Sequence, residues 1–205
     1  MKQKHQPGHG LLTLLQQQYG IPPATLQRVG ALVVMWATFE CDLEKALWRL
    51  SGEVPSGKVP TTDKMQTSQR IARFRQLGEN FEGQEWREMI TLVSDVAENL
   101  AAYRNAIVHG RLLPASVGGG IVLNSTWYGE LRKRPGMSAH IDETLVGIML
   151  DALHELIIVI AQLAHSDSAH NTNSHILPRR QSLRTARVNT SEVRYLTEAV
   201  NSEKY

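Results

Sequence analysis

The chain has 205 residues, of which 42% are hydrophobic and 20% are charged, and its formal net charge is +2. This length and apolar content predict one globular domain with tails and a real core. The weakly basic charge permits nucleic-acid binding, and the single cysteine, Cys41, excludes an internal disulfide and indicates a reducing compartment.

We expect neither a secretory signal nor a membrane span. Its first twenty residues hold two lysines and a short apolar cluster interrupted by Thr13, which is too short for a signal peptide. The most apolar stretch, 145–164, contains Asp151, His154 and Glu155. We therefore expect a cytoplasmic protein without a membrane partner.

Residues 1–23 form an N-terminal extension that ends in a linker at Pro22 and Pro23, and a long helix is expected over residues 24–50. Its apolar residues recur at steps of three and four, the spacing of a helix seam that faces a partner helix. Glu40 interrupts this seam. The seam consists of Leu26, Val29, Val33, Trp36, Glu40, Leu43, Leu47 and Leu50.

A turn region at 51–60 precedes a shorter helix that ends near Gly78. Thr61, Thr62 and Asp63 are expected to supply its N-cap. The helix is basic, and Arg70 and Arg73 are its candidate contacts with an RNA backbone. The alternative is that this charged face is only solvated.

The next helix, over residues 82–109, ends in a polar motif. Its seam of Trp86, Ile90, Val93, Ala97, Leu100, Arg104 and Ile107 places an arginine where an apolar residue is expected. Such an arginine needs a carboxylate, a phosphate or water, and pairing with Glu40 is one interpretation. Asn105 and His109 lie four residues apart on one face, and Gly110 is expected to end the helix in a left-handed conformation.

A small β-hairpin is expected at about 112–134, before a last long helix that starts near Asp142. Trp127 and Tyr128 within the hairpin either stack on bases or cover the edge of the core. Residues 166–205 are polar and basic and are expected to be largely disordered, with a helical turn or two around 191–200. The expected fold is therefore all-α, an up-and-down bundle of about four helices with its domain at 24–165.

Other chemistries have little support in the sequence. His165, His170 and His175 recur every five residues in the polar tail, without cysteines or regular ligand spacing, so no metal site is expected. The glycines at 118–120 lead into a strand-like run and not into a helix, which disfavours a phosphate-binding loop.

Arg104, Asn105 and His109, followed by Gly110, resemble the Arg-polar-x3-His signature of HEPN (higher eukaryotes and prokaryotes nucleotide-binding) domains. The resemblance implies a small helical bundle, often homodimeric. It also implies a metal-independent endoribonuclease of the toxin or phage-defence type, with Arg104, Asn105 and His109 as catalytic residues and no cofactor.

RNA is then the expected substrate, with Glu40 supporting Arg104, and with Arg70, Arg73 and Arg111 as binding residues. His109 would transfer protons, and Arg104 would clamp the phosphate. The expected partners are RNA, a second copy of the chain and an antitoxin protein. Two alternatives stay open: a non-catalytic RNA- or nucleotide-binding module of the same fold, and a partner-binding protein that acts through its basic tail at 179–194.

Overall fold

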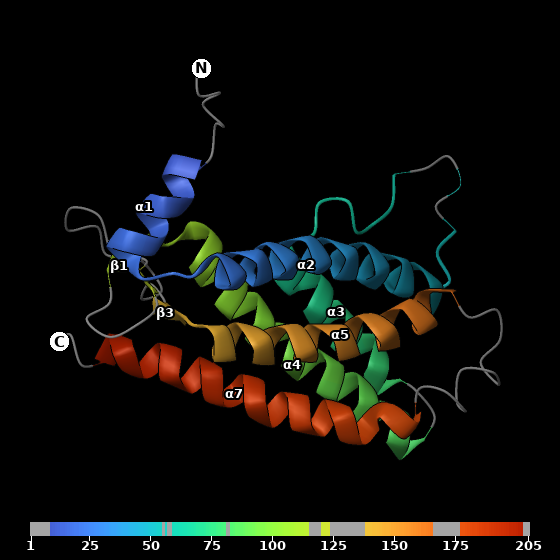
Figure 1. The fold of residues 1–205 in the computed structure, drawn as a ribbon. Coiled ribbons are helices and arrows are strands. Elements are labelled where there is room, and N and C mark those ends of the chain that lie inside the picture. The colour runs from blue at the N-terminus through green and yellow to red at the C-terminus, as the bar shows by residue number, and fades with distance from the viewer. Residues whose placement is uncertain are drawn as a thin grey trace.

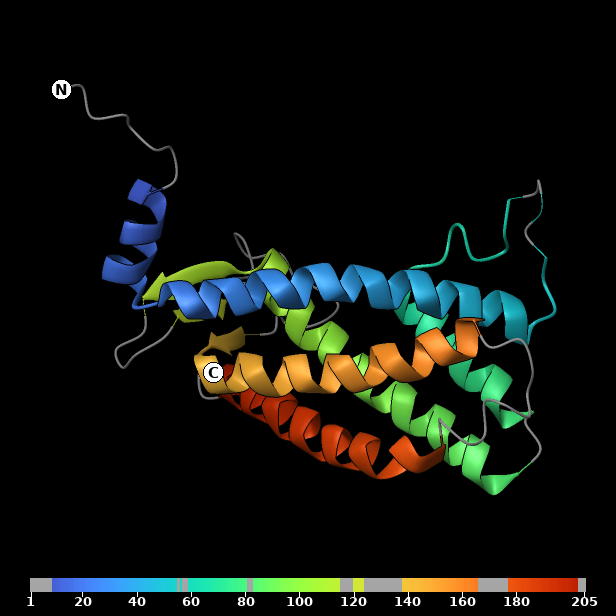
Figure 2. The same cartoon turned by 45° about the vertical axis from the view of Figure 1, so that its right-hand side comes forward.

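In the computed structural model, residues 9–54, 56, 59–80, 83–114, 120–123, 138–165 and 177–202 are described. These residues are mostly helical, as expected, and the long helices lie side by side as a bundle (Figures 1 and 2). The elements in chain order are α1 (His9–Tyr19), α2 (Pro23–Leu50), α3 (Thr67–Glu79), α4 (Gln84–His109), β1 (Arg111–Pro114), β2 (Gly120–Leu123), β3 (Ser138–Ile141), α5 (Glu143–His165), η1 (Leu177–Arg179) and α7 (Arg180–Ser202).

The helix seams of α2 and α4 form the centre of the core. Trp36, Leu43 and Leu47 of α2 are fully buried, and so are Ile90, Val93, Ala97 and Leu100 of α4, which confirms the later part of the predicted α2 seam and the middle of the predicted α4 seam. The first seam positions of α2, Leu26, Val29 and Val33, are only half-buried. Toward its end α4 departs from the prediction. There the buried positions are Tyr103 and Ala106, whereas Arg104 is only half-buried.

The helices alternate in direction except at α3. Thr67 and Arg70 of α3 contact Glu40 and Glu44 of α2 in the same order, so α3 runs parallel to α2. The segment between them returns along α2 before α3 begins (Figure 2). For this reason α3 starts later than expected, and its N-cap is Gln66 and not a residue at 61–63. The backbone N–H of Gln66 donates a hydrogen bond to the side chain of Gln69 at 2.8 Å.

The predicted hairpin is part of a three-stranded antiparallel sheet in the described part of the chain, in the order β1-β2-β3. Arg111 pairs with Leu123, and Ile121 pairs with His140. The third strand, β3, was not predicted. Trp127 and Tyr128 lie outside the described residues. Beside the sheet, Ile141, Val146 and Ile21 form a small apolar cluster, so the N-terminal extension is packed at Ile21.

The expectation of a largely disordered tail needs a correction, because residues 180–202 form the helix α7. Its apolar face is narrow, with Leu183, Ala186, Thr190 and Val193 buried at steps of three and four. This helix was not expected, because the segment is mostly polar and its apolar residues are few. α7 lies along α4 and α5 (Figure 1), and residues 166–176 fall outside the described part.

Helix α5 is long and apolar enough to span a membrane by length and composition alone. In the bundle it is a core helix, because one side of it is buried against its neighbours, through Val146, Met149, Ala152, Leu153, Leu156, Val159, Ile160 and Leu163. Its exposed positions include Asp151 and His154. This arrangement is consistent with a soluble protein.

Candidate functional site

The polar motif occupies the last two turns of α4, at the end of the bundle that carries the sheet (Figures 1 and 2). Tyr103 anchors this end of the helix, because its buried hydroxyl donates a hydrogen bond of 2.7 Å to the backbone carbonyl of His140 in β3. Burial, with a smaller contribution from the charge of Asp142, raises the pKa of Tyr103. The motif therefore stands on a helix end that is fixed to the sheet.

Arg104 lies next to this anchor and is half-buried. Its Nη1 donates to Oδ1 of Asn105 at 3.0 Å. Its Nε is shielded from solvent and has no hydrogen-bond partner among the described residues, and no carboxylate of those residues lies within 4.0 Å of the guanidinium. A partly desolvated arginine without a counter-charge favours an anionic ligand at the outer nitrogens of its guanidinium, because such a ligand would restore the charge balance.

The interpretation of Glu40 as the partner of Arg104 is wrong. Glu40 Oε1 accepts a hydrogen bond from Trp36 Nε1 at 2.8 Å and another from the Thr67 hydroxyl. Glu40 therefore links α2 to the first turn of α3. Its role is to position helices, and among the described residues the charge of Arg104 has no carboxylate partner.

Asn105 and His109 share one exposed face of α4, as predicted. No described residue forms a hydrogen bond with the His109 ring, which stands at the surface. Gly110 does not take the left-handed conformation that was expected. Its φ of −87° and ψ of 158° are extended, because β1 begins at the next residue and the chain leaves the helix directly into the sheet.

The three other predicted RNA contacts differ in their surroundings. Nη2 of Arg70 pairs with Glu44 at 3.3 Å and donates to the backbone carbonyl of Thr62 at 3.2 Å, so this charge is engaged within the fold. The Nε of Arg70, like that of Arg104, is shielded and has no hydrogen-bond partner among the described residues. Arg73 is exposed and bonds only the Gln76 side chain among the described residues, at 2.7 Å. Arg111 is the first residue of β1, directly after the motif. Arg73 and Arg111 remain candidates for RNA contact, and Arg70 is a structural residue.

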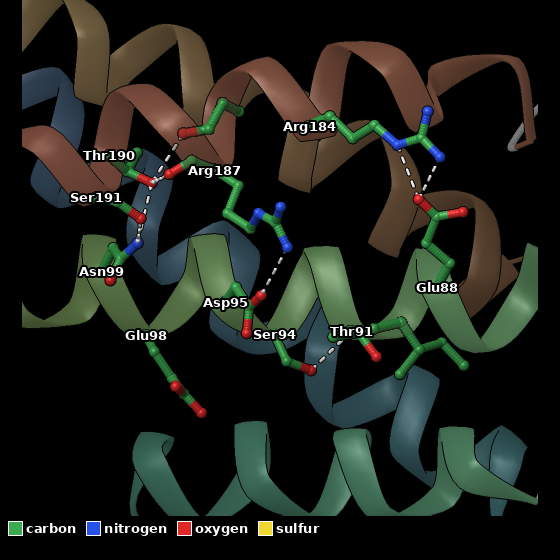
Figure 3. A network of polar contacts seen from close by, with 12 residues as sticks. Glu88, Thr91, Ser94, Asp95, Glu98, Asn99, Arg184, Arg187, Thr190 and Ser191 are labelled. Atoms are coloured by element: carbon green, nitrogen blue, oxygen red, sulfur yellow. Dashed lines mark hydrogen bonds and ion pairs between the residues drawn. The ribbon is translucent and has the colours of Figure 1, made fainter.

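The polar side of α4 before the motif is acidic. Arginines of α3 and α7 pair with its carboxylates, and the sequence analysis did not predict these pairs. Asp95 pairs with Arg75 of α3 at 2.9 Å and with Arg187 of α7 at 3.6 Å. Glu88 accepts from Nε of Arg184 at 2.8 Å (Figure 3). The regular spacing of the α7 arginines, three and four residues apart, was the available signal.

Within the described residues, no group of three or more His, Cys, Asp and Glu side chains is arranged to hold a metal ion. His165 lies 3.4 Å from the buried carboxylate of Asp42 at the far end of α5. His170 and His175 lie outside the described residues. A cavity of about 370 Å³ beside α3, with Arg73 and Glu53 in its wall, does not include the motif.

The fold and the site together define a helical bundle with a small sheet and a positively charged, incompletely partnered motif at one helix end. Comparison of the chain with family models, with curated proteins and with solved structures finds no match. The residues of the motif therefore carry the functional argument.

Proposed function

We propose that this protein is a metal-independent endoribonuclease of the HEPN type that acts in the cytoplasm on RNA as a toxin or in phage defence. The observation that carries the proposal is Arg104, whose shielded Nε has no hydrogen-bond partner and whose charge has no carboxylate partner among the described residues. Asn105 and His109 stand beside it on the exposed face of the same helix end. This is a positive site open to a phosphate.

The reaction uses the ribose itself. A base removes the proton of the 2′-hydroxyl, the resulting oxygen attacks the adjacent phosphorus, and the bond from phosphorus to the 5′-oxygen breaks. The leaving oxygen takes a proton from an acid, which leaves a 2′,3′-cyclic phosphate and a free 5′-hydroxyl. Arg104 would stabilise the charge on the phosphoryl oxygens, and His109 would transfer a proton.

Asn105 holds the guanidinium through its Oδ1, and its Nδ2 has no partner among the described residues. In this scheme Nδ2 donates to the phosphate beside the arginine. The two side chains would then bind adjacent phosphoryl oxygens, which fixes the orientation of the scissile phosphate.

A single histidine serves as base or as acid but not as both at once. We propose that two copies of the chain bring their motifs together across a two-fold axis, so that each supplies one histidine. Exposed residues without charge support such a contact. On α4 Val108 is 42% exposed, and on the exposed face of α2 the residues Gly30, Ala31, Val34, Met35, Ala37 and Thr38 are all uncharged.

One observation favours the alternative of a non-catalytic RNA-binding module. The His109 ring has no orienting hydrogen bond among the described residues, whereas a catalytic histidine is commonly held by a second group. In that case the motif would bind phosphate without turnover. The dimer proposal supplies the missing group from the second copy, so the two candidates differ in their oligomeric state and in turnover.

The test incubates the purified chain with end-labelled RNA, and with DNA of the same sequence, in excess chelator. We expect cleavage of RNA only, and a loss of about 100-fold or more in His109→Ala. His154→Ala, which removes an exposed histidine of α5, is the matched control and should cleave like the parent. RNA that survives high protein concentrations, or His109→Ala that cleaves as fast as the parent, would refute catalysis. Light scattering on the same samples reports whether the chain is a dimer.

A further inference from the structure

The basic side chains of α7 are turned toward the rest of the bundle. Arg180 Nη1 lies 3.1 Å from Glu85 and 3.6 Å from Glu88, and Arg187 lies 3.6 Å from Asp95. Figure 3 shows Arg184 on Glu88 and Arg187 on Asp95, both reaching from α7 to α4. Three arginines of α7 therefore form ion pairs with carboxylates of α4, the helix that carries the motif.

The apolar part of this contact is small over residues 180–195, where the structure describes the side chains. In that range Leu183 and Val193 are the buried large aliphatic side chains of α7, with Ala186 and Thr190 between them. The paired arginines remain 28 to 46% exposed. Ion pairs at this exposure are screened by salt, so the docking of α7 should depend on ionic strength far more than the packing of α2 does.

The contacts also fix the direction of α7. Arg180 contacts Glu85, Arg187 contacts Asp95, and Ser191 contacts Asn99, so the two helices run parallel. The C-terminal turns of α7 therefore lie at the end of the bundle that also carries the motif (Figure 1). Glu98, Asn105 and His109 lie at steps of seven and four along α4 and so share a face of the helix, where Glu98 pairs with Arg75 of α3 at 3.1 Å and not with α7.

We propose that α7 is a charge-masking strap. When docked, it pairs with Glu85, Glu88 and Asp95 of α4, and an extended phosphate chain can then lie along α4 and reach Arg104. When released, it leaves Glu85, Glu88 and part of the charge of Asp95 unpaired, and these repel the chain. This inference rests on the proposed function insofar as the motif end binds phosphates, and it adds regulation by ionic strength to that site.

The experiment measures hydrogen exchange of the α7 amides and binding of inorganic polyphosphate, which carries phosphates but no ribose. It compares the full-length parent with Arg184→Glu, with the charge-swapped pair Glu88→Arg and Arg184→Glu, and with Arg87→Glu. Arg87 is the control, because it is exposed on α4 beside Glu88 and forms no ion pair with α7 in the described part. Its reversal changes the net charge equally.

We expect Arg184→Glu to speed exchange in α7 by about tenfold and to weaken polyphosphate binding several-fold more than Arg87→Glu does. The swapped pair should restore both readouts, and raising NaCl from about 50 to 500 mM should speed exchange in α7 of the parent.

Exchange in α7 that responds neither to salt nor to Arg184→Glu would overturn the strap. Equal losses of polyphosphate binding in Arg184→Glu and Arg87→Glu, or a parent that binds no polyphosphate, would overturn the masking. Polyphosphate binding that follows the strap, in a chain that leaves RNA intact, would refute the ribonuclease and leave this inference standing.

Discussion

The close contact between α3 and α4 at Gly78 allows the stability change of a substitution there to be predicted. This contact holds α4, the helix that carries the motif, in place. A Cβ atom at this position would lie 2.4 Å from Cγ2 and 2.8 Å from Cβ of Ile90. Both distances are far below van der Waals contact. The Cβ atom of Ile90 is fixed by its backbone, and Cγ2 moves only if the stiff χ1 angle of this β-branched residue changes. Relief requires the two helices to separate, at a cost of about 3 kcal/mol, the upper part of the range for overpacking.

Gly78→Ala also removes a glycine from a helix, which stabilises the helix by about 1 kcal/mol. The expected net loss is therefore about 2 kcal/mol, or a decrease in Tm of roughly 4–8 °C for a chain of this size. The matched control is Gly30→Ala on the exposed face of α2, where no atom lies within 4 Å of the new Cβ. This variant should gain about 1 kcal/mol and melt roughly 2–4 °C higher.

Calorimetry or circular dichroism of both variants at one protein concentration measures these shifts. An Ile90→Ala background removes Cγ2 and Cδ1, so the same Gly78→Ala change should cost less there than in the parent. A Gly78→Ala protein that melts as high as Gly30→Ala would refute the close approach of α3 to α4 on which the placement of the motif helix depends.

Two further predictions concern the contacts that fix α4. Tyr103→Phe loses the bond to the His140 carbonyl and should destabilise the protein by about 1–2 kcal/mol in urea unfolding at pH 8. Because burial raises the pKa of Tyr103, the folded state keeps this proton, and the stability that depends on it is present below about pH 10 and lost above it. The parent should therefore lose more stability than Tyr103→Phe between pH 9 and about 11, and equal slopes would contradict the assignment. Asp95→Asn weakens the pairs with Arg75 and Arg187 and should cost about 0.5–1 kcal/mol at low salt, with a smaller difference between the urea midpoints of variant and parent in 500 mM NaCl. A salt-independent difference would show that Asp95 acts through packing instead.

The helices with strong apolar periodicity were predictable from local sequence. α2 was expected at 24–50 and spans Pro23–Leu50, and α4 was expected at 82–109 and spans Gln84–His109. α7 was not predicted, because over residues 180–195 its seam offers one leucine and one valine in a polar stretch. The carboxylates of α4 that its arginines contact are about 90 residues away in the sequence, so local periodicity does not report them.

The partners of charged residues were likewise not readable from the chain. Glu40 and Arg104 interrupt matching seams, which made a pair reasonable, but the return of the chain before α3 brings Thr67 to Glu40 instead. At Gly110 a helix end was correctly expected, whereas its backbone conformation was set by the start of β1.

The sequence by itself determined the helical class of the fold, the extent of its main helices and the placement of Arg104, Asn105 and His109 at one helix end, because periodicity and spacing within a helix are local properties. Only the tertiary structure decided that Arg104 has no carboxylate partner among the described residues, that Arg70 is engaged with Glu44, and that α7 covers the acidic side of α4. These facts depend on which helices approach one another, and that is set by the packing of the whole core.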